Sequence, residues 1–365
     1  MTVFSTALLT LSLTGCCEVH TTRPSATTAT KNGPTRGALE PSTKSSSSPK
    51  APTSIELPFS IETGEPFSID GLPGRHSYSV ASSISGKQNR FLIVGGSGGG
   101  LHGFAVSKTS ASGSPPDKLP EEDKTLRVID IAVRKTWSKS IDDLQVENVD
   151  LEALQAMNAQ CYQDGDRLLI AGGYGFSRKA GSPGGMITFD TLTILDVPRV
   201  IDAIISGGPI GDAIQQLHDP LLKVTGGGLE KLGDRYFLVL GQTFDGLYTA
   251  PDTGHYFRQT YTRQVRTFRI ATTPQLALTD TDAYPKFPGG SIRPDILPQT
   301  DHLRRRDLHV LPAVSSNLTQ QIAIYGGVFA PGQFDGHLHP IYFESVVGQY
   351  FTINGYHYQA TVLSP

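Results

Sequence analysis

Histidine and arginine residues stand just before or at the start of several short apolar segments, and they are the side chains best suited to bind a ligand. Arginine donates two parallel hydrogen bonds to a carboxylate or sulfate group, so clusters of arginine and histidine favour anionic ligands. The densest cluster follows His302 and consists of Arg304, Arg305 and Arg306. Alternate residues of a strand share a face, so Arg304 and Arg306 should point one way and Arg305 the other.

A glycine-rich stretch, Gly95–Gly99, formally matches the G-x-S-x-G motif of serine hydrolases. That motif needs a following helix, because the turn aims the serine over the helix N-terminus. A Ser/Pro-rich stretch follows instead, and the dinucleotide fingerprint G-x-G-x-x-G fails for lack of a helix and a third glycine. Carboxylates do not recur in pairs at a defined spacing either. We therefore predict no catalytic residue, and enzymatic activity is the less favoured interpretation.

Two short motifs could begin a metal site, and neither is complete. His337 and His339 would place two imidazoles on one side of a strand or tight loop, but the spacing fixes no third ligand. Asp280 and Asp282 resemble the start of a calcium loop, yet proline and serine occupy the positions that need glycine and glutamate. We predict no metal and no cofactor.

Composition limits the classes of partner. The chain has 365 residues with a net charge of −3 and 18% charged residues, so neither nucleic acid nor an anionic membrane surface is indicated. The 39 glycines and 25 prolines against a single tryptophan indicate many turns and little long helix.

Residues Ala7–Cys16 form an apolar segment that ends in small residues and a cysteine. The segment is too short to span a bilayer as a helix and has the size of a signal-peptide core. Leu13-Thr-Gly-Cys16 resembles the lipobox of bacterial lipoproteins, which implies that residues 1–15 are removed and that Cys16 is lipidated. The absence of Lys and Arg from Met1–Thr6 departs from the signal-peptide pattern, and the alternative is a buried N-terminal strand.

Residues 16–56 carry the lipidated cysteine and a Ser/Thr/Pro/Lys-rich stretch that has little to bury, so we predict a disordered tether. Cys17 follows the lipidation site in place of aspartate. By resemblance to lipoprotein sorting, this favours export to the outer membrane, facing the periplasm or the cell surface, with the lipid as the sole membrane contact. Cys17 and Cys161 are too few for a disulfide framework, and Cys161 is predicted to be an inert buried thiol.

An apolar run closed by glycine recurs four times, as Asn89–Gly96, Asp166–Gly175, Asp234–Gly241 and Gln321–Gly327. Such a run is typical of a strand buried on both faces. Further strand candidates flank each run: His76–Val80, Thr125–Asp130 and Lys135–Ser138; Ala159–Tyr162 and Phe189–Asp196; Leu222–Thr225 and Val265–Ile270; Arg306–Val310 and Pro340–Phe343. Each repeat thus predicts a four-stranded antiparallel sheet, and radial stacking of such sheets protects their edges. We expect an all-β protein with a β-propeller over residues 57–365.

These repeats resemble kelch repeats, whose mark is a diglycine that ends the second strand of a blade, with a downstream aromatic residue such as Trp137. The successive spacings between Gly96, Gly173, Gly241 and Gly327 are 77, 68 and 86 residues, whereas kelch repeats are about 50 residues long. The excess is assigned to long loops such as Ser107–Lys124 and Ala271–Pro298, and short helical turns are expected within Asp142–Ala159 and Arg199–Ile205. Four blades are predicted, with Tyr356–Pro365 as the start of a fifth, and the ring is expected to be incomplete.

In a propeller the first strands line a central channel, so the polar residues that open them form the candidate ligand site. These residues are Arg75, His76, Asn158, Gln160, His302, Arg304 and Arg306. The alternative is a solvated arginine run whose charges pair with Asp301 and Asp307. The loops offer the aromatic residues Tyr248, Tyr256, Phe257 and Tyr261, which favour a module that binds a protein or carbohydrate ligand. The resemblance also leaves open a periplasmic sugar-modifying enzyme of the sialic acid epimerase type.

Overall fold

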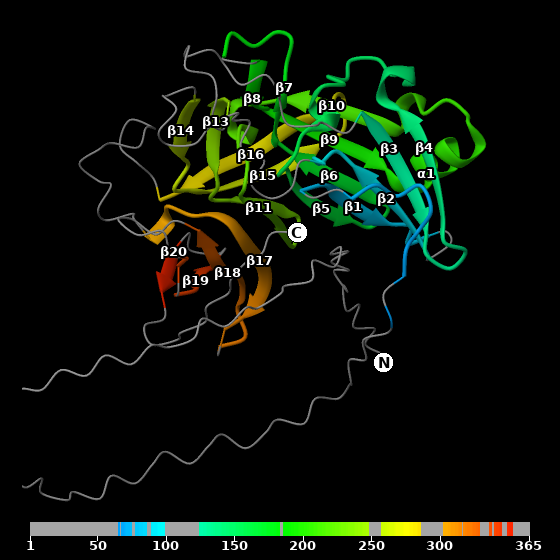
Figure 1. Cartoon of the computed structure of the whole chain (residues 1–365). Helices are drawn as coiled ribbons and strands as arrows, with labels where there is room; N and C mark the ends of the chain where they lie inside the picture. The colour runs from blue at the N-terminus through cyan, green and yellow to red at the C-terminus, as the bar shows by residue number, and fades with distance from the viewer. Residues whose placement is uncertain are drawn as a thin grey trace, which may run out of the picture. The chain divides into compact units, whose positions relative to one another are not determined.

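The computed structural model describes residues 65, 67–74, 77–85, 89–98, 124–182, 185–247, 257–285, 302–315, 317–328, 336–337, 339–344 and 349–352 (Figure 1). The chain divides into two units, and the described residues from Ser68 onward belong to one of them. The predicted signal peptide, Cys16, and Tyr356–Pro365 lie outside the described residues.

The described part of the chain is predominantly β-structure, as predicted, and most strands form four antiparallel four-stranded sheets. The first sheet contains β1 (Ser79–Ser82), β2 (Arg90–Val94), β3 (Thr125–Asp130) and β4 (Lys135–Ser140). The second contains β5 (Gln160–Asp164), β6 (Arg167–Ala171), β9 (Thr191–Asp196) and β10 (Ile214–His218). The third contains β11 (Gly228–Leu232), β12 (Arg235–Val239), β15 (Val265–Ala271) and β16 (Ala277–Tyr284). The fourth contains β17 (Arg306–Val314), β18 (Gln320–Val328), β19 (Ile341–Glu344) and β20 (Gln349–Thr352). Within each sheet the strands pair in chain order.

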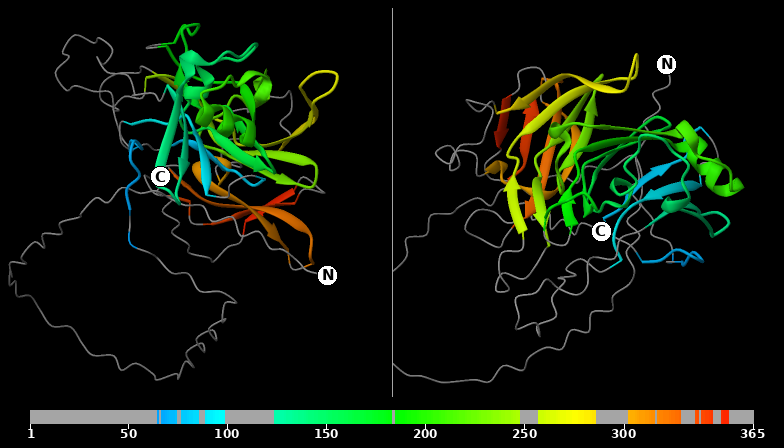
Figure 2. Two further views of the ribbon diagram at one scale, coloured as in Figure 1. Left: turned by 90° about the vertical axis from the view of Figure 1, so that its right-hand side faces the viewer. Right: turned by 90° about the horizontal axis from the view of Figure 1, so that it is seen from above.

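Two additional hairpins interrupt the second and third sheets at the same point, between the second and third strands. The first hairpin pairs β7 (Tyr174–Phe176) with β8 (Met186–Thr188), and the second pairs β13 (Gln242–Gly246) with β14 (Phe257–Tyr261). They lie beside one another in Figure 1 and in the right-hand view of Figure 2. Much of the extra repeat length therefore forms hairpins rather than plain loops.

Two local predictions are wrong. The loop expected at Ala271–Pro298 contains β16, which pairs with β15 as the outer strand of the third sheet. The strand expected at Leu222–Thr225 does not form, because this segment begins inside the 3-10 turn η5 (Pro220–Leu222). The first strand of the third sheet is β11, which starts further along the chain. The turn forms because the Asp219 carboxylate accepts a hydrogen bond from the Leu221 N–H at 2.8 Å and proline favours the first helical position. Of the loop expected at Ser107–Lys124, only residue 124 is described.

The helical elements are η1 (Ile141–Asp143), η2 (Ala153–Gln155), η4 (Gly211–Ala213), η5 and one α-helix among the described residues, α1 (Val197–Ser206). The elements η1, η2 and α1 overlap the two segments where short helical turns were predicted, whereas η4 and η5 lie outside them. Helix α1 begins because the Asp196 side chain accepts from the Arg199 N–H, and it ends at Gly207, whose φ is 74°. Its apolar face packs with the first two sheets in one core.

Apolar cores fill the spaces between successive sheets, and the second strands supply residues to the cores on both sides. Leu92, Leu169 and Phe237 face the following sheet, whereas Ile170 and Leu238 face the preceding one. The second-strand residues predicted to be buried are all at most 6% exposed: Ile93, Leu168, Leu169, Ile170, Leu238, Val239 and Ile324. Burial of each such side chain contributes about 1.5–3 kcal/mol.

The glycine pairs that end the second strands also join each sheet to the next. Gly172 has a φ of 63°, and a Cβ at this position would lie 2.1 Å from the Val224 carbonyl oxygen, so only glycine allows the approach. In the first three repeats, the second residue of the pair donates its N–H to the segment that precedes the next first strand: Gly96 to Ala156 (3.2 Å), Gly173 to Val224 (2.8 Å) and Gly241 to Arg305 (3.1 Å). In the third repeat the pair is Leu240-Gly241 rather than two glycines. The diglycine thus closes a strand and connects two sheets.

A second set of backbone hydrogen bonds links the entrances of the four first strands. Each entrance has one residue of positive φ: Ser77 (58°), Asn158 (54°), Gly226 (65°) and Asp307 (53°). Each of the last three donates its N–H to the carbonyl oxygen of the one before, at 2.9, 3.1 and 2.7 Å respectively. Within the described ranges, no hydrogen bond or apolar core joins the fourth sheet to the first, so no closed ring is seen.

Candidate functional site

Five of the seven residues predicted to bind a ligand are described, and two of them meet at Asp307. The Asn158 Nδ2 donates to Asp307 Oδ1 at 2.9 Å, and Arg306 Nε lies 3.8 Å from Asp307 Oδ2. Gln160 Nε2 donates to the Asn158 carbonyl oxygen at 2.8 Å. Arg306 thus lies near Asp307, as the alternative interpretation expected, but its side chain is 12% exposed and is therefore not solvated as that interpretation required. Arg75, His76 and Asp301 lie outside the described residues.

The prediction that Arg304 and Arg306 share one face of a strand is wrong, because β17 begins at Arg306. The guanidinium of Arg304 lies 4.3 Å from the centroid of the Tyr261 ring, in cation–π geometry. Arg305 is buried, and its guanidinium donates to the carbonyl oxygens of His302, Gly326 and His339 at 2.7, 3.0 and 2.7 Å. Burial lowers the pKa of Arg305 to about 10. Arg305 therefore fixes the backbone beside the fourth diglycine.

Of the His337-x-His339 motif, His337 is buried and His339 is half-buried. The ring of His337 is hydrogen-bonded to the Arg304 carbonyl oxygen at 3.0 Å. Burial, together with the positive charge of Arg305, lowers the pKa of His337 to about 4, so the ring is neutral at pH 7. In the described part of the chain, no three His, Cys, Asp or Glu side chains converge to hold a metal ion.

Burial of the Cys161 thiol raises its pKa, in keeping with the prediction of an inert cysteine.

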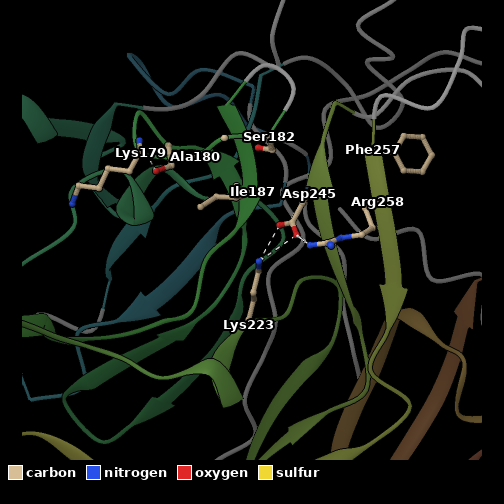
Figure 3. A pocket seen from close by; sticks show the side chains of 10 residues that line it. Lys179, Ala180, Ser182, Ile187, Lys223, Asp245, Phe257 and Arg258 are labelled. Atoms are coloured by element: carbon tan, nitrogen blue, oxygen red, sulfur yellow. Dashed lines mark hydrogen bonds and ion pairs between the residues drawn. The ribbon is translucent and has the colours of Figure 1, made fainter. Parts of the chain in front are cut away.

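A pocket that the sequence did not reveal lies between the two inserted hairpins (Figure 3). Its volume is about 600 Å³, and it is lined by Ser177, Lys179, Ala180, Gly181, Ser182, Ile187, Lys223, Asp245, Phe257 and Arg258. These residues come from the β7–β8 connection, β8, the segment after η5, and the hairpin β13–β14. Of the four aromatic loop residues singled out in the sequence, Phe257 is in this lining.

Hydrogen bonds and an apolar cluster connect the two hairpins that border the pocket. The Thr188 hydroxyl donates to the Phe244 carbonyl oxygen at 2.8 Å and accepts from the Phe244 N–H at 2.7 Å. The Tyr174 hydroxyl donates to the Gly246 carbonyl oxygen at 2.6 Å. The Phe244 ring stacks on the Phe257 ring with centroids 4.7 Å apart, in an apolar cluster that also contains Met186 and Leu247.

Asp245 is the electrostatic centre of the pocket (Figure 3). Its side chain is 13% exposed and forms ion pairs with Lys223 Nζ and with Arg258, each at 3.1 Å. Burial acts to raise the pKa of Asp245, but hydrogen bonds from Lys223 and Arg258 outweigh this effect and leave the pKa below its usual range. The carboxylate is therefore ionised at neutral pH and holds both cations at the pocket.

Comparison with models of protein families gives no match, and comparison with curated proteins gives none either. Among the helices of the described ranges, none has the length and apolar character that a membrane span requires. The kelch resemblance, the export pathway and the ligand class therefore stay predictions.

Proposed function

We propose that this protein is a kelch-type β-propeller that acts as a saccharide-binding module, anchored to the cell envelope through a lipid on Cys16. Four features support the propeller: the repeated sheets, the diglycine hydrogen bonds, the ladder of positive-φ residues, and the apolar cores between successive sheets. A kelch resemblance alone leaves the function open, since function lies in the sites carried by the fold.

The observation that carries the binding function is the pocket between the two inserted hairpins. Its volume of about 600 Å³ falls in the usual range for small-molecule sites and suits one or two sugar rings better than a flat protein surface. The lining combines hydroxyl and charged groups with Ile187 and Phe257. Asp245 is already held by two cations, so it is poorly placed to serve as a general acid or base, which favours binding over the sugar-modifying enzyme.

Obstruction of the pocket tests this function. The full chain should capture one or more saccharides from a glycan array, and Ile187→Trp should abolish capture because the indole fills the space between the hairpins. Val133→Trp is the matched control, since Val133 is 64% exposed and lies in the turn between β3 and β4. Capture that survives Ile187→Trp, or no saccharide captured at all, would reject the assignment.

A further inference from the structure

The charges of the pocket do not cancel. Its lining contains three cations, Lys179, Lys223 and Arg258, against one carboxylate, Asp245, so the described lining carries a net charge of +2. We propose that the ligand of this pocket is an acidic saccharide, whose carboxylate or sulfate group binds at Lys223 and Arg258. This inference rests on the proposed saccharide-binding function and specifies the class of sugar.

Geometry places the anion beside Asp245 rather than elsewhere in the pocket. Lys223 and Arg258 reach Asp245 from opposite sides, whereas Lys179 lies on the far side of the pocket (Figure 3). Two cations share one carboxylate, which leaves a charge of +1 at this point. A guanidinium has five N–H donors, and Arg258 contacts Asp245 through one nitrogen, Nη2. Arg258 can thus donate two parallel hydrogen bonds to an incoming anion while it keeps its contact with Asp245.

The remaining lining provides for the sugar ring itself. The Phe257 ring is held in place by its stacking on Phe244, and Ile187 adds an apolar wall. Aromatic rings that are fixed in this way offer contact area at low conformational cost. Ser177 and Ser182 lie in the β7–β8 connection that also carries Lys179, and they add hydroxyl groups to the lining. Carboxylates and sulfates share the same recognition chemistry at arginine, so the structure specifies the charge rather than the acid.

Exposure sets the expected strength of the interaction. The side chain of Arg258 is 81% exposed and that of Lys223 is 36% exposed, so solvent and salt screen the attraction. Binding should therefore be of moderate affinity and should weaken as the ionic strength rises.

The experiment compares acidic and neutral sugars of the same ring by isothermal titration calorimetry with the full chain. The probes are oligosaccharides that contain glucuronic acid, their glucose counterparts, and 6-sulfated glucose counterparts. The acidic probes should bind about tenfold or more tightly than the neutral ones, and Arg258→Gln should remove about tenfold of that preference. Lys223→Gln is the second variant. Arg178→Gln is the control, because Arg178 is 74% exposed, pairs with Glu152 and is not part of the lining.

The two proposals fail in different ways. Equal affinity for neutral and acidic probes, with binding still blocked by Ile187→Trp, would overturn the acidic saccharide and leave the saccharide site standing. Acidic preference that Arg258→Gln and Lys223→Gln both leave unchanged would also overturn it. Absence of binding by every probe would reject both proposals. Preference for uronate over sulfate, or the reverse, would identify the acid.

Discussion

The connection between sheets through the diglycines makes a quantitative prediction at Gly172. Gly172→Ala would place a methyl group 2.1 Å from the Val224 carbonyl oxygen and 2.8 Å from that of Leu222, both backbone atoms of the segment that leads into the third sheet. Relief requires that the second and third sheets separate, which lengthens the 2.8 Å hydrogen bond from Gly173 to Val224. A buried hydrogen bond that is lost costs about 1–3 kcal/mol, in addition to about 1–2 kcal/mol for alanine at positive φ. We expect Gly172→Ala to lower the free energy of unfolding by about 3 kcal/mol or more.

Gly165 is the matched control for this experiment. It lies in the turn between β5 and β6 with a φ of 61°, close to the 63° of Gly172, but a Cβ there meets no atom within 4 Å. Gly165→Ala should therefore cost the backbone strain alone, about 1–2 kcal/mol. The assay is equilibrium urea unfolding of the full chain, with both variants measured against the parent protein. Equal losses at the two positions would refute the inter-sheet connection.

Three further predictions concern other parts of the chain. Leu240→Gly should destabilise the protein by about 1–4 kcal/mol, because the loss of a fully buried leucine side chain outweighs the relief of backbone strain at its φ of 53°. A higher urea midpoint for this variant would contradict the prediction. The pKa of His337 falls to about 4, so the free energy of unfolding should decline as pH drops from about 6.5 towards 4, because the unfolded chain binds a proton that the folded chain does not. In unfolding experiments at a series of pH values, His337→Gln should flatten this decline. An unchanged slope would contradict the role of His337. Mass spectrometry of protein from its native host should find Cys16 lipidated and residues 1–15 removed, and an intact, unmodified N-terminus would exclude this.

The second and third strands could be predicted because their signal is local. Residues such as Leu169 and Val239 lie in continuous apolar runs, and a run that is buried on both faces needs no distant partner to be recognised. The strand β16 was missed for the opposite reason. Its pattern, Ala277–Tyr284, is largely polar and partly exposed, as expected for the outer strand of a sheet.

The pocket could not be predicted because no segment carries it. Lys223 and Asp245 meet only after the hairpin β13–β14 folds back over η5, and Ser177 and Arg258 are 81 positions apart in the chain. The sequence shows Phe257 as one of several aromatic residues in loops, but it does not show which charged residues lie near its ring. For the arginine run, the sequence shows the high density of positive charge but not the burial of Arg305. Arg305 is 1% exposed because three carbonyl oxygens, rather than a carboxylate, accept its hydrogen bonds.

The second and fourth diglycines have the same backbone shape and one kind of contact in common. Gly326 and Gly327 have φ angles of 63° and 94°, nearly those of the second pair at 63° and 96°. In the second pair, a Cβ at Gly172 would meet the segment before the next sheet, whereas a Cβ at Gly173 would lie 2.7 Å from the Ala156 Cβ, within its own repeat. In the fourth, a Cβ at Gly327 would lie 2.9 Å from the Arg305 Cβ, and the Gly326 carbonyl oxygen accepts from the Arg305 guanidinium at 3.0 Å. The second glycine of both pairs therefore makes room for a residue that precedes the first strand of its own repeat, an alanine in the second repeat and a buried arginine in the fourth.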